Sequence, residues 1–186
     1  MRRLQLFVAT SLDGYVAGHG GDLSWRLGGE ELFATAWSCV DTILMGRRTY
    51  EAACRSGWPH AGRRIVVFGR DVAPSIATAQ TVATSRPVVD VVTELRARDG
   101  GALALVAGGQ LASACFAARL VDDVFVVVHP VLLGAGTRWM EDGRAQTKLA
   151  VLAERRHPTG VVQLACRVER SGAASDASAP SVPTPG

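Results

Sequence analysis

The chain has 186 residues, of which 48% are hydrophobic and 20% are charged, and its formal net charge is +3. This length and hydrophobic content suit one domain with a sizeable core. The 20 basic residues are nearly balanced by 17 acidic ones, whereas a dedicated nucleic-acid binder has a stronger basic bias. The composition therefore argues against nucleic acid as the partner.

The cysteines and histidines indicate neither a disulfide framework nor a metal site. Four of each are scattered along the chain without a CxxC pair. Near the amino terminus, the apolar run is interrupted by Gln5 and reaches Asp13 too early for a signal peptide or a membrane span. We therefore expect a cytoplasmic protein with reduced cysteines, no bound metal and no membrane association.

The first strand is predicted over Leu4–Thr10, which is rich in leucine, phenylalanine and valine. It runs into Ser11–Gly14, a turn by composition. Asp13 is then expected at the carboxyl end of a strand, which is where open α/β sheets bind their ligands.

A helix is predicted from about Gly28 to Cys39, because apolar residues recur there at helical spacing. Glu30 and Glu31 fall in its first turn. Each acid has two interpretations, since it either serves a reaction or only complements the positive end of the helix dipole.

The segment Asp41–Glu51, DTILMGRRTYE, joins a buried strand to a helix that begins with two arginines. Gly46 ends the strand and permits a sharp turn and a close ligand. Arg47 and Arg48 place guanidinium groups, and Thr49 a hydroxyl, at the positive end of the helix dipole. That combination suits a ligand with more than one phosphate. The alternative is a solvated basic helix end.

A similar corner follows the next apolar strand, Ile65–Phe68, which ends in Gly69 and Arg70. Arg70 is thus placed like Arg47. Successive parallel strands that each end in Gly-Arg bring both guanidinium groups to one edge of the sheet.

The second half of the chain continues the alternation of strands and helices. A buried strand over Leu103–Val106 enters Ala107-Gly108-Gly109 and then a helix from about Gln110, an arrangement that suits a pyrophosphate at a helix amino terminus. The tail over 171–186 is rich in serine, alanine and proline and is expected to be disordered, which leaves one domain over 1–170. The remaining predicted elements are the strand Thr78–Thr84, the helix Pro87–Arg98, the strand Val121–His129, and a C-terminal antiparallel hairpin of Ala150–Arg156 and Gly160–Val168.

Six motifs follow one another along the chain: ATSLDGYVAG, LSWRL, DTILMGRRTYE, IVVFGR, VAGGQLA and LVDDVFVVVHPVLLGAG. Their order, from about Leu4 to Glu169, resembles the dihydrofolate reductase-like superfamily, and more closely its bacterial branch related to the reductase domain of riboflavin biosynthesis. The resemblance implies a three-layer α/β fold with a twisted, mostly parallel eight-stranded sheet, helices on both faces and a C-terminal antiparallel hairpin. It also implies hydride transfer from NADPH.

By position, the resemblance assigns the cofactor to three segments. Two positions depart from the family pattern, because Gly69 stands where a hydroxyl residue is common and Ala107 where the first glycine of a pair is expected. A non-proline cis peptide is expected between Ala107 and Gly108. The assignments are Gly46, Arg47, Arg48 and Thr49 to the phosphates, Gly69 and Arg70 to the 2′-phosphate, and Ala107, Gly108 and Gly109, followed by Gln110 and Leu111, to the pyrophosphate and nicotinamide side.

Two acids are candidates for the catalytic carboxyl group. Trp25 begins a WxLxxE pattern that resembles the segment carrying the dihydrofolate reductase carboxylate, and Glu30 is its positional match. Asp13 lies instead in the SLDG turn, near the implied place of the nicotinamide. A carboxyl group in a partly apolar pocket suits proton transfer near neutral pH.

We therefore expect an NADPH-dependent reductase that transfers hydride to a small heterocyclic (pteridine- or pyrimidine-like) or carbonyl substrate, without metal or flavin. The alternative is a nucleotide-binding module without catalytic activity, which the departures at Gly69 and Ala107 keep open. Nucleic-acid binding through arginines such as Arg63 and Arg64 lacks an aromatic stacking platform. The resemblance also implies a homodimer.

Overall fold

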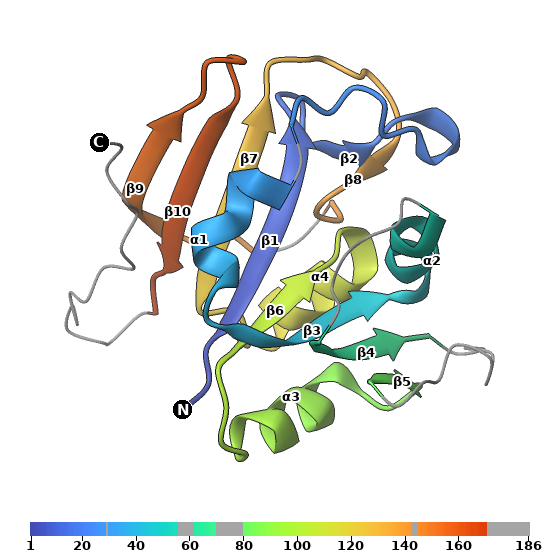
Figure 1. The fold of residues 1–186 in the computed structure, drawn as a ribbon, viewed down its shortest axis with the longest axis vertical. Coiled ribbons are helices and arrows are strands. Elements are labelled where there is room, and N and C mark those ends of the chain that lie inside the picture. The colour runs from blue at the N-terminus through green and yellow to red at the C-terminus, as the bar shows by residue number, and fades with distance from the viewer. Residues whose placement is uncertain (29, 56–61, 70–79, 143–144, 171–186) are drawn as a thin grey trace.

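A single large sheet organises the molecule (Figure 1). The computed structural model describes residues 1–28, 30–55, 62–69, 80–142 and 145–170, and within these ranges the sheet has eight strands in the order β5-β4-β3-β6-β1-β7-β10-β9. Neighbours from β5 to β7 pair in parallel, whereas β10 is antiparallel to both β7 and β9. The strands are β1 (Leu4–Ser11), β3 (Val40–Gly46), β4 (Arg64–Phe68), β5 (Thr81–Thr84), β6 (Ala102–Val106), β7 (Asp123–His129), β9 (Leu149–Arg156) and β10 (Val162–Val168).

The central strands are buried on both faces, as their continuous apolar sequences predict. In β3, the side chains of Ile43, Leu44 and Met45 are all fully buried. Successive side chains of a strand point to opposite faces, so Leu44 joins one hydrophobic core while Ile43 and Met45 join another. The sheet therefore separates two cores, and each needs a cover.

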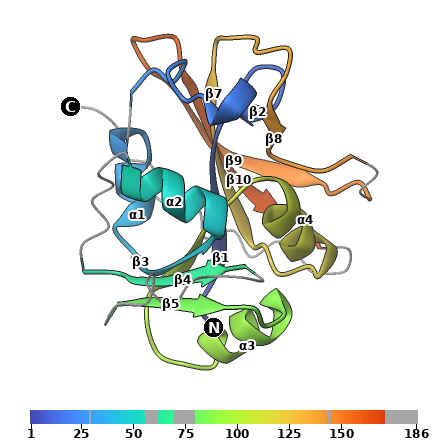
Figure 2. The same cartoon turned by 90° about the vertical axis from the view of Figure 1, so that its right-hand side faces the viewer.

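Helices supply that cover on both sides, as Figure 2 shows. The helices α1 (Ala34–Trp37) and α2 (Arg47–Arg55) lie on one face, and α3 (Val88–Arg96) and α4 (Gly109–Ala117) lie on the other. No helix in the described ranges is long and apolar enough to cross a membrane. The expected three-layer α/β fold, including the C-terminal antiparallel hairpin, is thus confirmed.

The segment between β1 and β3 differs from the expected helix over Gly28–Cys39. It forms a 3-10 helix, η2 (Glu30–Phe33), followed by the single turn of α1. Gly28 has φ +83°, which cannot belong to a right-handed helix, so the helical part begins later than its apolar spacing suggests. The short 3-10 helix η1 (His19–Gly21) precedes it in the same connection.

A second, two-stranded sheet was not predicted. It pairs β2 (Tyr15–Ala17) with β8 (Thr137–Arg138) in antiparallel orientation. Figure 1 shows it beside the carboxyl end of β1. Two segments far apart in the sequence therefore meet next to the edge of the main sheet where ligands were expected.

The domain boundary at residue 170 stays a prediction. The expected tail over 171–186 lies outside the described residues, as do residues 78 and 79 of the expected strand Thr78–Thr84. The described part of that strand, β5, begins at Thr81.

Arginines and aspartates pair along the amino ends of the parallel strands. Asp123, the first residue of β7, is 2% exposed and accepts hydrogen bonds from Arg3 at 2.6 and 2.7 Å and from Arg167 at 3.3 Å. Next to it, Asp122 accepts a bond of 2.6 Å from Arg96 of α3. The two carboxylates thus connect β1, β7 and β10 and one helix at the edge opposite to the expected ligand site.

Replacing Asp123 by asparagine should lower the free energy of unfolding by about 2–3 kcal/mol, because a buried charge that pairs with two arginines is lost. Urea denaturation measures this change. The matched control Asp99→Asn alters an exposed aspartate and should stay within about 0.5 kcal/mol of the wild type. A loss no larger than that of the control would contradict a stabilising role for this ion pair.

Candidate functional site

Strand register brings three of the predicted segments to one edge of the sheet. Gly46 at the end of β3 pairs with Phe68, so Gly69 follows directly beside it. Met45 pairs with Val106, which places Ala107 next to Gly46 on the other side. The carboxyl ends of β3, β4 and β6 therefore form one row, as expected for a ligand site in an open α/β sheet.

The start of α2 is exposed and positively charged. A Cβ added at Gly46 would meet nothing within 4 Å, so the space in front of this residue is open, but the turn itself does not require glycine. Arg47 and Arg48 are both exposed in the first turn of the helix. Arg47 forms an ion pair of 2.7 Å with Glu51, whereas Arg48 makes no ion pair with a described residue.

The turn between β6 and α4 is tightly covered. Ala107 is buried, Gly108 is extended (φ −128°, ψ 179°), and Gly109 has φ +56°. A Cβ at Gly108 would lie 3.0 Å from Val16 Cγ2, and the Gly109 N–H donates to the Trp139 carbonyl at 3.0 Å. Gly109 is favoured by its backbone conformation, whereas a side chain at Gly108 would require Val16 to shift by a few tenths of an ångström.

The expected cis peptide between Ala107 and Gly108 is wrong. All peptide bonds in the described ranges are trans. The positive φ of Gly109 redirects the chain into α4, so the turn is made without a cis bond.

The amino end of α4 presents unpaired donors. The N–H groups of Gln110 and Leu111 belong to the first helical turn and make no hydrogen bond with another described residue. Gln110 is exposed, and the helix dipole adds positive potential at this end. Such a terminus favours an anion.

The predicted 2′-phosphate pair is only partly described. The Gly69 N–H donates to the Thr84 carbonyl at 3.0 Å, which ties β4 to the end of β5. Arg70 lies outside the described residues. Its assignment therefore stays a prediction.

Asp13 holds two loops together. Its carboxylate accepts a 2.6 Å bond from the Ser11 hydroxyl, and bonds of 2.8 to 3.1 Å from the N–H groups of Leu133 and Gly134. We call this set of bonds the Asp13 clamp. The bond from Ser11, followed by the backbone bonds, lowers the pKa of Asp13 from 3.8 to about 2. The group is ionised at neutral pH, which does not suit a proton donor.

Glu30 lies in a segment anchored over β7. Its backbone opens η2, and Leu32, two residues on, is 5% exposed and packs with Val127 and Val161. The Gln163 side-chain amide donates to the Leu32 carbonyl. The segment therefore lies on the α1 face, close to the carboxyl end of β7, while the role of Glu30 stays a prediction.

One residue of this region was missed by the sequence analysis. His129, at the end of β7, is 1% exposed, and its Nδ1 accepts the N–H of Leu27 at 3.0 Å. The ring of Trp25 meets the imidazole edge to face, with 5.1 Å between the ring centroids. The only available signal was a His-Pro pair at the end of a predicted strand, because the contact itself joins residues 102 positions apart.

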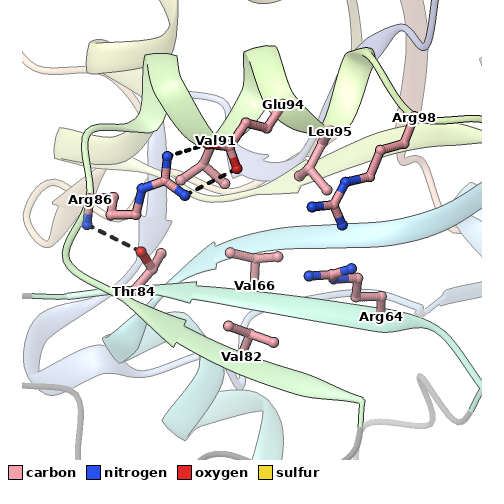
Figure 3. A pocket seen from close by; sticks show the side chains of 9 residues that line it. All are labelled: Arg64, Val66, Val82, Thr84, Arg86, Val91, Glu94, Leu95 and Arg98. Carbon is pink, nitrogen blue, oxygen red and sulfur yellow. Dashed lines mark hydrogen bonds and ion pairs between the residues drawn. The ribbon is translucent and has the colours of Figure 1, made fainter.

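A separate cavity lies between α3 and the strands β4 and β5 (Figure 3). Arg64 and Arg98 point toward each other at one end of it, and Arg86 pairs with Glu94 at the other. None of the predicted site residues lines this cavity. It does not belong to the row of strand ends described above.

The eight-stranded, mostly parallel sheet with helices on both faces is the fold of the dihydrofolate reductase-like class. Residues 2–163 match the model of the family described as RibD C-terminal domain. The chain therefore belongs to that family.

Individual relatives agree with this classification. The Bacillus subtilis protein named Uncharacterized protein YyaP is 25% identical over 178 residues, 88% of this chain and 93% of that protein. A putative riboflavin biosynthesis protein from Shewanella sp. PV-4 has a TM-score of 0.78 at 22% identity, covering 90% of this chain and 99% of that one. Dihydrofolate reductase from Enterococcus faecalis, solved with NADP(H), has a TM-score of 0.64 at 16% identity and covers 90% and 97%. The likeness to the two solved structures establishes the fold.

Replacing Asp13 by asparagine should lower Tm at neutral pH, because the amide cannot accept all the bonds of the Asp13 clamp. A lowered pKa means that the ionised group stabilises the fold above about pH 4, and that this contribution disappears as the pH falls toward about 2. The difference in Tm between wild type and variant should therefore shrink over that window, as measured by calorimetry.

The control Asp99→Asn removes an exposed carboxylate and should leave Tm unchanged at neutral pH. A difference between wild type and Asp13→Asn that stays constant down to about pH 2 would contradict the assignment of the lowered pKa to the Asp13 clamp.

Proposed function

We propose that this chain is an NADPH-dependent reductase that transfers hydride to a small heterocyclic (pteridine- or pyrimidine-like) or carbonyl substrate. The observation that carries the proposal is the convergence of Gly46, Gly69 and the Ala107–Gly109 turn at one sheet edge, together with the amino ends of α2 and α4. Membership of the RibD C-terminal domain family supports it, as does the likeness to a dihydrofolate reductase solved with NADP(H).

The residues at this edge fit the anionic part of a dinucleotide. The space in front of Gly46 is open, Arg48 lacks a described ion-pair partner, and Gln110 and Leu111 offer backbone donors. Guanidinium groups and helix amino termini both bind phosphate oxygens. Arg48 would hold one phosphate, and the start of α4 would hold the pyrophosphate.

When bound, the reduced dinucleotide would supply the hydride, and this chain would then have to supply a proton. The clamped, ionised Asp13 is poorly suited to that task. Glu30 remains the better candidate for the proton donor, because it follows the Trp25–Leu27 segment, which lies against the carboxyl end of β7. Proton transfer by a positioned carboxyl group is worth about 10²–10⁴-fold in rate.

The alternative of a nucleotide-binding module without catalysis has no observation of its own in its favour. Saturable NADPH binding without turnover, across a panel of oxidised and dihydro pteridines, aminopyrimidines and aldehydes, would overturn the reductase proposal. Turnover of any of these with oxidation of NADPH would support it.

We also propose a homodimer. The apolar strand β7 lies inside the sheet and its side chains are mostly buried, so it is not available as an interface. Apolar exposure remains on the hairpin, where Val151 is 60% exposed and Leu149 and Val162 are 37% and 36% exposed. This surface is the candidate interface.

Replacing Arg48 by alanine should weaken NADPH binding by about 10- to 100-fold, which corresponds to the loss of one charged hydrogen bond of about 1.5–3 kcal/mol. Isothermal titration of NADPH and NADH checks the change, and the wild type should prefer NADPH. The control Arg155→Ala removes an exposed arginine of β9, the outermost strand on the side of the sheet away from β3, and should not alter Kd. Unchanged affinity for NADPH in Arg48→Ala would show that Arg48 does not bind the cofactor.

Replacing Glu30 by glutamine should lower kcat by about 10²-fold or more and leave NADPH affinity intact, because the amide cannot deliver a proton. Glu31→Gln is the matched control and should do little, since adjacent residues of a 3-10 helix such as η2 point about 120° apart. Steady-state assays on a substrate that the wild type reduces provide the test. Full activity in both variants would mean that a water molecule or another group of the protein supplies the proton.

A further inference from the structure

His129 combines complete burial with a single, specific hydrogen bond. The residue pairs with Ser11 across β1 and β7 and is 1% exposed. Its Nδ1 accepts the Leu27 N–H at 3.0 Å, while its Nε2 is buried without a partner in the described part of the chain. A core position that needed only volume would be filled at lower cost by an apolar side chain.

The segment that His129 holds is a loop with few other anchors. Trp25 Nε1 donates to the Asp22 carbonyl at 3.1 Å, which is a contact inside the loop itself. Arg26 donates to the Val16 carbonyl at 3.1 Å, which ties the loop to the small sheet. Among the described hydrogen bonds of residues 25–27, the one to His129 alone reaches the main sheet.

We propose that His129 is a positioning residue that fixes the Trp25–Leu27 segment against the end of β7. It thereby fixes the position of the backbone that leads into Glu30. The inference rests on the proposed function for its catalytic consequence. Trp25 meets the imidazole edge to face at an interplanar angle of 88°, so the same ring orients both the backbone of Leu27 and the indole. Glu30 begins η2 only three residues after Leu27.

The bond to Leu27 exists only in one protonation state. Nδ1 accepts a hydrogen bond when the imidazole is neutral and the proton is on Nε2. Burial, followed by the nearby charge of Arg26, lowers the pKa of His129, so the neutral form is maintained near neutral pH. A proton added at Nδ1 would face the Leu27 N–H and break the bond.

The neighbouring charges also favour the neutral ring. Arg26 is the cation that acts on it from the loop. The carboxylates of the adjoining segments are otherwise engaged, Asp22 with Ser24 and Asp13 in the Asp13 clamp. His129 forms no ion pair with a described carboxylate.

Amide hydrogen exchange at Leu27 in the full chain tests the proposal directly. His129→Leu removes the acceptor and should speed exchange at Leu27 by about tenfold or more, while His129→Asn keeps an acceptor near the position of Nδ1 and should retain most of the protection. Asp99→Asn is the control and should leave this exchange unchanged, because it alters an exposed side chain in the α3–β6 connection, at the amino ends of the strands. Equal exchange in the wild type and both His129 variants would overturn the proposal.

The effect of His129 on catalysis is measured separately, through kcat. With a substrate that the wild type reduces, His129→Leu should lower kcat by about 10-fold or more with unchanged Kd for NADPH, and His129→Asn should restore most of it. Equal losses in both variants would overturn the positioning role. If wild type binds NADPH without turnover, the proposed function fails, while protection of Leu27 still decides whether His129 holds the loop.

A third measurement does not depend on the stability of the leucine variant. The fluorescence of Trp25, taken as the difference between wild type and Trp25→Phe, should change as His129 becomes protonated on acidification, together with loss of Leu27 protection. The midpoint should lie below about pH 6.5 and be absent in His129→Asn. A midpoint that persists in His129→Asn would overturn the proposal.

Discussion

The parallel pairing of β6 between β3 and β1 is the constraint on which the rest of the site depends. Val106 at the end of β6 pairs with Met45 on one side and with Phe7 on the other. Beyond Phe7, β1 continues to Ser11 in register with β7. Strand β1 is therefore longer than β6 at this edge, and the turn from β6 into α4 lies beside its last residues. The connections that leave β1 and β6 go to opposite faces of the sheet, and α/β sheets bind ligands where neighbouring connections diverge in this way.

Charge is divided between the two edges of the sheet. At the amino ends of the strands, aspartates are matched by arginines, for example Asp41 with Arg2 and Asp123 with Arg3. At the carboxyl ends, Arg48 and the first turn of α4 remain without such partners among the described residues. The pairing stabilises one edge, and the surplus positive potential at the other is available to an anionic ligand.

The sequence predicts the strands well and their connections poorly, for a physical reason. A run such as Ile43–Met45 is buried on both faces, and continuous apolar character reports that directly. The helix expected from Gly28 fails because glycine conformation depends on context, and here φ is positive. The three residues of β2 are too few to show a period, and their partner strand is 120 positions away.

The candidate site shows the same division. Gly46, Gly69 and Gly108 are recognisable because each follows an apolar strand, and the register then brings them together. His129 carries no local pattern, since its function as an acceptor appears only when the loop at Leu27 folds onto β7. Asp13 is recognisable as part of a turn, but its use as a clamp depends on Leu133 and Gly134, which belong to the loop after β7, about 120 residues further along the chain.

The Asp13 clamp also connects the carboxyl end of β1 to the turn that follows β6. It fixes Gly134, and the chain then passes through β8 to Trp139, whose N–H donates to the Gly14 carbonyl at 3.3 Å. The Trp139 carbonyl accepts the Gly109 N–H at 3.0 Å, which is the first donor of α4. One continuous set of hydrogen bonds thus runs from the SLDG turn to the glycine turn. The carboxylate of Asp13 therefore holds these two turns together, while its expected role as an acid stays a prediction.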